Sequence, residues 1–206
     1  MSEIISLEDI LKQLYAISGI LIDVYDLEGH SVARYPDTGA YFCSLVTRNS
    51  QGCERCGRDN REAFATVREE HKVHIYRCHM GLYEAVFPLY HYGRLAGYMM
   101  TGQMLEKREG AAEEVMQKAR QMNLGSEEEI AEGVKKLVRM RVWKRSGAFD
   151  DHVQGSVRTM IRPTIISSRS LPLERPKRSS AIWKSITGRT LLWKGCAAGS
   201  GTARQG

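Results

Sequence analysis

The chain lacks any apolar run that approaches the roughly 20 residues needed to span a bilayer. Its first residues, Met1-Ser2-Glu3, do not have the basic and then apolar order of a secretory signal peptide. A phosphate-binding loop, a Gly-x-Ser-x-Gly nucleophile elbow and a His-Glu-x-x-His motif are also missing. From these absences we expect a soluble cytoplasmic protein that is not an enzyme.

Acidic residues are scarce in the last third of the chain. Residues 1–140 contain 17 Lys/Arg and 21 Asp/Glu, a balance of −4, whereas residues 141–206 contain 13 and 3, a balance of +10. The two balances add to the net charge of +6 for all 206 residues. The pI of about 9.1 therefore describes the tail, and it gives no reason to expect a basic nucleic-acid-binding fold.

Residues 141–206 also lack a sustained hydrophobic period of either 2 or 3.6. We therefore predict a domain over residues 1–140 and a basic tail over residues 141–206. The tail is either disordered or a segment translated out of frame after residues 140–146. The abrupt inversion of charge in the middle of a predicted helix favours the second interpretation.

Within residues 1–140 the hydrophobic pattern alternates between helical and extended periods. Helices are predicted over 7–18, 42–50, 53–70, 110–123 and 126–140, and strands over 19–26, 30–35, 73–78, 82–89 and 95–103. Two strands, a helical crossover and a three-strand meander predict an α+β fold with an antiparallel sheet of about five strands, similar to a PAS or GAF-like domain.

Four cysteines fall close together in the sequence, at Cys43, Cys53, Cys56 and Cys78. Four thiolates, two of them in a C-x2-C pair, would make a closed structural site for zinc or, alternatively, hold an iron–sulfur cluster. The same residues could be a redox-sensing dithiol, since a thiol at a helix start has a lowered pKa, or small buried hydrophobes. His79 should not join Cys78 on one ion unless the strand has ended there, because neighbouring strand residues point to opposite faces.

Several short strings in a fixed order resemble the PocR sensory domain over about residues 5–140. They are Tyr41-Phe42-Cys43, Gly52-Cys53-Glu-Arg-Cys56 with Asp59 and Ala63, Tyr76-Arg77-Cys78-His79-Met80-Gly81-Leu82, Phe87-Pro88-Leu89, and Gly97 with Thr101-Gly102-Gln103. The resemblance departs at Met80, where the family string has alanine. It implies a PAS-like fold that senses a small hydrocarbon derivative such as a short diol, in a regulator with an AraC-type, histidine kinase or cyclic-dinucleotide output domain.

A ligand of this kind would bind in a pocket between the sheet and the crossover helices. We expect His79, Tyr76, Tyr83, Met99 and Gln103 to line it, although aromatic and Met residues at period 2 are also typical of a core. Gln103 is the most suitable of them, because an amide both donates to and accepts from a hydroxylated ligand. Glu84, on a central strand, needs a partner, and Arg77 on the neighbouring strand is the predicted one.

The predicted partners are thus a small-molecule ligand and, through the terminal helices, a second copy of the chain. The helix over 126–140 is placed to couple ligand binding to an output domain. DNA would be contacted only through such a domain, which is not recognisable in this sequence, and no membrane is expected. The alternative function is a cysteine-based metal or redox sensor.

Overall fold

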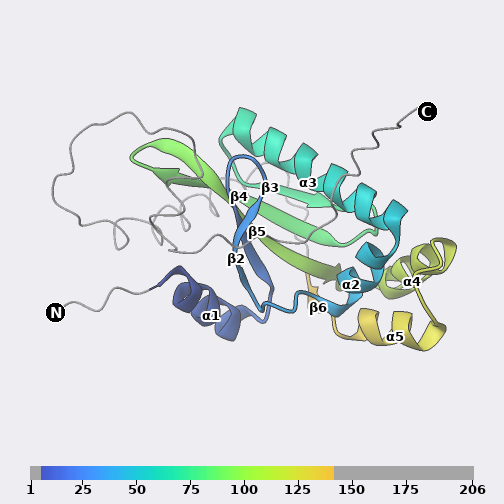
Figure 1. Ribbon diagram of the computed structural model, residues 1–206. Coiled ribbons are helices and arrows are strands. Elements are labelled where there is room, and N and C mark those ends of the chain that lie inside the picture. Colours follow the sequence, from blue (N-terminus) through green and yellow to red (C-terminus); the bar gives the residue numbers. More distant parts are fainter. Residues whose placement is uncertain (1–5, 142–206) are drawn as a thin grey trace, which may run out of the picture.

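A computed structural model describes residues 6–141 of the chain (Figure 1). Its helices are α1 (Leu7–Ser18), α2 (Tyr41–Arg48), α3 (Ser50–Glu70), α4 (Ala111–Gln121) and α5 (Glu127–Lys135). Its strands are β1 (Ile22–Tyr25), β2 (Ser31–Tyr35), β3 (His74–Arg77), β4 (Tyr83–His91), β5 (Arg94–Glu106) and β6 (Val138–Met140). No helix among the described residues is long and apolar enough to cross a membrane.

The strands form one sheet in the order β2-β1-β5-β4-β3, and every neighbouring pair in that order is antiparallel. The central strands β1 and β5 are brought together although most of the domain lies between them in sequence, while β4 and β5 form a long hairpin. The α2–α3 crossover joins β2, at one edge, to β3 at the other. The predicted α+β fold with a PAS/GAF-like antiparallel sheet is confirmed.

Helix α1 has the bounds that the sequence predicts, because both ends carry local signals. The side chain of Ser6 accepts a hydrogen bond from the backbone N–H of Asp9, and Gly19 ends the helix in the left-handed conformation with a φ of 66°. Helix α1 packs on the sheet face that carries Ile22 and Val24.

The crossover is broken at Asn49, earlier than the predicted break at Gln51-Gly52. The side chain of Asn49 accepts a hydrogen bond from the backbone N–H of Gly52 and so caps α3. Gly52 lies against the end of α2, where a Cβ atom would come within 2.4 Å of the carbonyl oxygen of Val46. Helix α3 can therefore begin directly after α2.

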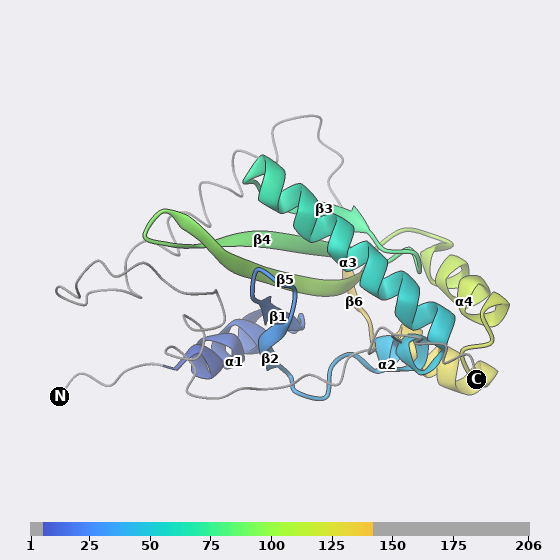
Figure 2. The same ribbon diagram turned by 45° about the horizontal axis from the view of Figure 1, so that its top comes forward.

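Helix α3 runs across one face of the strands (Figure 2). Its residues Ala63, Phe64 and Val67 are buried against sheet residues, and the rings of Phe64 and Tyr98 stack with their centroids 4.6 Å apart. A second cluster joins α2, α4 and α5 to the end of the sheet, with Phe42, Leu82 and Leu105 fully buried. The core thus lies under α3 and at the adjoining end of the sheet under α2, α4 and α5, and the site lies where these two clusters meet.

The C-terminal helix is shorter than predicted. The sequence predicts a helix over 126–140, but α5 ends at Lys135 and residues Val138–Met140 form β6, which pairs parallel to the end of β5. The physical reason is that Leu137 is buried in the core and the backbone N–H of Lys107 donates to the carbonyl oxygen of Met140 at 2.7 Å. The expected long coupling helix is therefore wrong, and the predicted tail over 141–206 lies outside the described residues, apart from its first residue.

Candidate ligand-binding site

A group of polar side chains lies at the end of the helix-covered sheet face, where α2, α3 and the β3–β4 loop meet. Strand β3 ends at Arg77, and residues 78–81 form a turn in which the backbone N–H of Gly81 donates to the carbonyl oxygen of Cys78 at 2.7 Å. Gly81 has a φ of 88°, which only glycine adopts readily. His79 is consequently on a turn and not on a strand, so the alternation argument that separated Cys78 from His79 does not apply.

Asp59 of α3 holds His79 in one orientation. The Oδ2 atom of Asp59 accepts the backbone N–H of His79 at 2.8 Å and lies 2.7 Å from the Nδ1 atom of the ring. A carboxylate only accepts, so Nδ1 carries the proton and, in the neutral ring, Nε2 is left with a lone pair. The side chain of His79 is 10% exposed, and its Nε2 atom is buried without a hydrogen-bond partner among the described residues.

The second buried atom without a hydrogen-bond partner among the described residues belongs to Gln103. Its Oε1 oxygen is buried and, within residues 6–141, makes no hydrogen bond. Gln103 follows Gly102, which pairs with Glu84 of β4, and Leu105 two positions later packs in the cluster formed with α2. The β4–β5 register shifts between Tyr83, which pairs with Met104, and Glu84, which pairs with Gly102, so Gln103 is the extra residue of a β-bulge and strand alternation does not assign its side chain to a face. Gln103 and His79 are linked through Glu84, since Gly102 pairs with Glu84 and the charge of Asp59, which holds His79, acts on the same carboxyl group.

Glu84 is the buried carboxyl group of this site, and its partner is not the one predicted. The hydroxyl of Tyr76 donates to Oε2 of Glu84 at 2.6 Å and lies 3.3 Å from Oδ1 of Asn60 on α3. Burial raises the pKa of Glu84 to about 7, the Tyr76 hydrogen bond lowers it, and the charge of Asp59 raises it further.

The predicted pair of Glu84 with Arg77 is wrong. Strand alternation places Arg77 on the other side of β3 from Tyr76, where its Nε atom donates to the carbonyl oxygen of Gly81 at 3.2 Å. Its guanidinium carbon also lies 5.5 Å from the centroid of the Tyr83 ring, and it forms an ion pair with Glu114 of α4. Arg77 therefore joins the turn to α4, and no other basic side chain of residues 6–141 forms an ion pair with Glu84.

Three thiols surround the same end of the face. Cys43 of α2, Cys56 of α3 and Cys78 of the turn are partly buried against one hydrophobic cluster, and all three are free cysteines. Burial raises the pKa of Cys56 and of Cys78 to about 12, and the pKa of Cys43 is raised in the same direction for the same reason. The expected lowering at a helix start is wrong, because Cys56 lies beyond the first turn of α3, where the helix dipole has faded.

The predicted metal set is only partly brought together. Cys53 is buried on α3 one turn before Cys56. Among the residues that the structure describes, no group of three or more His, Cys, Asp or Glu side chains has an arrangement that could hold a metal ion. The zinc or iron–sulfur site at Cys43, Cys53, Cys56 and Cys78 stays a prediction, which metal analysis of anaerobically purified protein would test.

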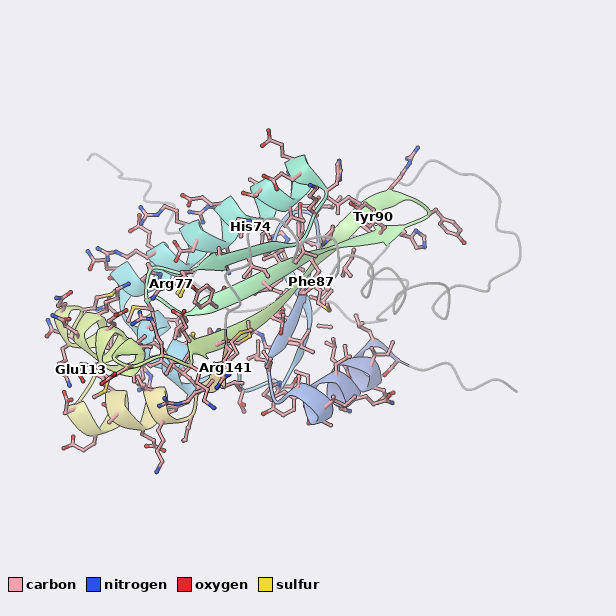
Figure 3. The ribbon with its side chains drawn as sticks, turned by 180° about the vertical axis from the view of Figure 1, so that it is seen from behind. His74, Arg77, Phe87, Tyr90, Glu113 and Arg141 are labelled. Carbon is pink, nitrogen blue, oxygen red and sulfur yellow. The ribbon has the colours of Figure 1, made fainter. Side chains whose placement is uncertain are left out.

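Tyr83 and Met99 lie on the opposite face from Tyr76 and His79. Met99 packs with Leu11 of α1 and Val24 of β1 in the cluster behind the sheet. Tyr83 lies beside Arg77, which Figure 3 shows from that side. The five predicted ligand residues are therefore divided, with Tyr76 and His79 on the helix-covered face, Tyr83 and Met99 on the other, and Gln103 at the β-bulge beside the Gly102–Glu84 pair.

A family model described as the sensory domain found in PocR matches residues 2–148, which is more than half of the chain. The chain belongs to the PocR sensory-domain family. This confirms the suspected resemblance and establishes a sensing role for the domain. Searches of curated proteins and of solved structures found no match.

In this PocR domain, sequence reasoning missed the parts of the site that α3 contributes. In the sequence, Asp59 stands out only through the family resemblance, and Asn60 only as a member of the apolar helix face. The available signal was their position three and four residues after Cys56, which places all three toward the same side of the helix. With them, the candidate site is built by α2, α3, β3, β4, β5 and the turn over residues 78–81.

Proposed function

We propose that this PocR domain senses a small neutral metabolite that presents two neighbouring hydrogen-bond donors, such as a short diol. The observation that supports this proposal is the pair of buried atoms without partners among the described residues, Nε2 of His79 and Oε1 of Gln103. In the neutral ring of His79 both are acceptors, because the proton that Asp59 holds is on Nδ1. A buried acceptor without a donor destabilises the protein by about 1–3 kcal/mol, and a ligand hydroxyl removes that penalty.

Two acceptor atoms that need donors argue against small metabolites that bring further acceptors. A carboxylate or an aldehyde would place its own acceptor atoms against Nε2 and Oε1, and a carboxylate would also meet the acidic groups of Asp59 and Glu84. The three protonated thiols of Cys43, Cys56 and Cys78 supply weakly polar surface that suits a short carbon chain. We propose binding without turnover, because no activated nucleophile accompanies His79 in the described part of the chain.

The proposal is tested by calorimetric titration of the full chain with 1,2-propanediol, 1-propanol and lactate. We expect the diol to bind, the single alcohol to bind roughly tenfold more weakly because one donor is lost, and lactate not to bind. His79→Ala and Gln103→Ala should each weaken the diol roughly tenfold. His30→Ala is the matched control, since His30 is exposed on the β1–β2 turn.

Two results would overturn the proposal. One is the absence of diol binding by the wild-type chain, and the other is diol binding that neither His79→Ala nor Gln103→Ala changes. We also propose that the domain forms a homodimer and that ligand binding controls a regulatory output. The route from the site to an output would begin with α4, which is bonded to the ligand turn through Lys118.

A further inference from the structure

A third acceptor lies beside the two that the proposed function uses. Within residues 6–141 the only hydrogen bond to the Glu84 carboxyl group is the one that Tyr76 donates to Oε2, so Oε1 accepts none. Glu84 pairs with Gly102 in the sheet, and a Cβ atom on Gly102 would come within 3.0 Å of Cγ of Glu84. The carboxyl group is therefore next to the backbone of Gln103, and its charge interacts with Asp59, which holds His79.

The groups that face Glu84 from each surrounding element are acidic or neutral. Those connected to it by a hydrogen bond or by charge are Tyr76 from β3, Asp59 and Cys56 from α3, Cys43 from α2 and Cys78 from the turn. Behind them, Asn60 accepts from the Tyr76 hydroxyl, the ring of His74 stacks on Tyr76, and His79 is bonded to Asp59. No basic side chain among the described residues forms an ion pair with Glu84.

Two cations on neighbouring elements are engaged elsewhere. Arg34 donates from Nε to Oδ2 of Asp23 at 2.7 Å, and Lys118 donates to the backbone carbonyl of His79 at 2.9 Å. A buried carboxylate without a cation is unfavourable, and a cation supplied by a ligand would compensate it. The site thus offers three acceptors, one of which can carry a negative charge.

We propose that this site, in addition to diols, binds vicinal amino alcohols, with the ligand ammonium on Glu84 and the ligand hydroxyl between His79 and Gln103. The inference rests on the proposed function, because it uses the same two acceptors. An ammonium group brings three donors and a positive charge, whereas the second hydroxyl of a diol brings one donor and no charge. The charge-assisted bond is the stronger of the two.

Burial of the Glu84 carboxyl group sets the direction of the pH dependence, because burial raises its pKa. Because the pKa of Glu84 is raised to about 7, the empty site is mostly protonated at pH 6 and mostly ionised at pH 8. Binding of a cation stabilises the ionised form, so amino alcohol binding releases a proton near pH 7. Affinity for the amino alcohol should increase from pH 6 to pH 8, while affinity for the diol has no such requirement.

The test is calorimetric titration of the full chain with 1-amino-2-propanol and 1,2-propanediol, which have nearly the same shape. At pH 8 we expect the amino alcohol to bind at least tenfold more tightly than the diol, and at pH 6 the ratio should fall severalfold. Titration in two buffers of different ionisation enthalpy should show proton release. Glu84→Gln should bring the ratio of the two dissociation constants close to 1, and Glu132→Gln, on the exposed side of α5, should leave it unchanged.

Tyr76→Phe is the second variant, and it covers the case in which Glu84→Gln does not fold. It frees Oε2 while keeping the carboxylate, so the preference for the amino alcohol should persist or increase. Diol binding without a preference for the amino alcohol at pH 8 overturns this inference and leaves the proposed function intact. A preference that survives Glu84→Gln also overturns it. If neither compound binds the wild-type chain, the proposed function fails and this inference fails with it.

Discussion

Asp59 accepts two hydrogen bonds from His79, one from the backbone N–H at 2.8 Å and one from the ring Nδ1 at 2.7 Å. The relationship joins α3 to the turn after β3 and, in the neutral ring, leaves Nε2 as the acceptor. A residue 20 positions away in the sequence thereby sets the polarity of the site.

We predict that Asp59→Ala weakens diol binding roughly tenfold, by the 1–2 kcal/mol expected for loss of one matched hydrogen bond. Without the Asp59 oxygen no group among residues 6–141 accepts from Nδ1, so the ring proton can move to Nε2 and present a donor where the ligand also has a donor. Calorimetry with 1,2-propanediol measures the loss, and nitrogen NMR of His79 reports the tautomer. Asp37→Ala, in an exposed loop, is the control; an unchanged tautomer in Asp59→Ala would contradict the prediction.

Lys118 of α4 is the second support of the ligand turn, through its 2.9 Å bond to the carbonyl oxygen of His79. We predict that Lys118→Met speeds hydrogen exchange of the backbone amides of residues 79–81 and weakens diol binding about threefold to tenfold. Lys135→Met, in the exposed last turn of α5, should change neither quantity. Equal exchange rates in the two variants would show that Lys118 does not hold the turn.

The elements predicted well from the sequence are those whose ends carry local signals. Helix α1 has Ser6 at its start and Gly19 at its end, and α5 has the predicted Ser126 cap, whose capping box with Glu129 fixes its beginning. The end of α5 is not predictable in this way, because Val138–Met140 continue a plausible helical pattern. Only pairing with Met104–Glu106, far away in the sequence, makes them a strand.

The site, like the fold, is only partly predictable from the sequence. Residue type makes His79 and Gln103 candidates for ligand binding, and both lie in strings that resemble the family. Their partners depend on tertiary contacts: Tyr76 rather than Arg77 bonds to Glu84 because of the face each occupies on β3. The separation of Tyr83 from Tyr76 follows from the register of β3 with β4, in which Tyr83 lies opposite Arg77 and Glu84 lies opposite Tyr76, and the hydrophobic pattern does not reveal that register.

The buried carboxyl of Glu84 predicts a specific dependence of stability on pH. Its pKa rises from 4.5 to about 7 on folding, so between these values the folded state binds more protons than the unfolded state. The contribution of Glu84 to the free energy of unfolding is fully present below about pH 4.5. It is lost as the pH rises through 7, and the loss is on the order of 3 kcal/mol. Glu84→Gln removes this dependence, since its amide oxygen still accepts from Tyr76.

The measurement is urea unfolding of the wild-type chain and of Glu84→Gln at pH 5 and at pH 8. The difference between the two proteins isolates Glu84, because the other carboxyl groups, including buried Asp23, are common to both. We expect Glu84→Gln to gain stability relative to wild type between pH 5 and pH 8. A difference that is the same at both pH values would rule out an ionising Glu84.

The thiols of the site should react slowly in the folded protein. With the pKa of Cys56 and of Cys78 raised from 9.0 to about 12, the thiolate fraction at pH 8 is about a thousandfold below that of an unperturbed cysteine. We predict that iodoacetamide labels the peptides containing these two residues far more slowly in buffer than in urea, as measured by mass spectrometry. Labelling at the unfolded rate would contradict the prediction, and it would favour the redox-sensing alternative.

A single methyl group added at Gly102 should have the sharpest effect on the site. Its φ of 152° is unfavourable for other residues, and a Cβ atom there would lie 3.1 Å from the carbonyl oxygen of Tyr83 as well as 3.0 Å from Cγ of Glu84. Neither neighbour can move away, since the first is backbone and the second is buried beneath Tyr76. Gly102→Ala should therefore destabilise the domain by about 2 kcal/mol or more and displace Gln103 and Glu84 together.

Gly93, at the tip of the β4–β5 hairpin, is the matched control for Gly102. It has a positive φ of 75°, but a Cβ atom added there would meet no other atom of the described residues within 4 Å. Gly93→Ala should therefore show only the backbone effect of about 1 kcal/mol. Urea unfolding compares the two variants, and titration with 1,2-propanediol shows whether the acceptors have moved. If Gly102→Ala is no more destabilised than Gly93→Ala and binds diol normally, then Gly102 has no part in placing Glu84 and Gln103.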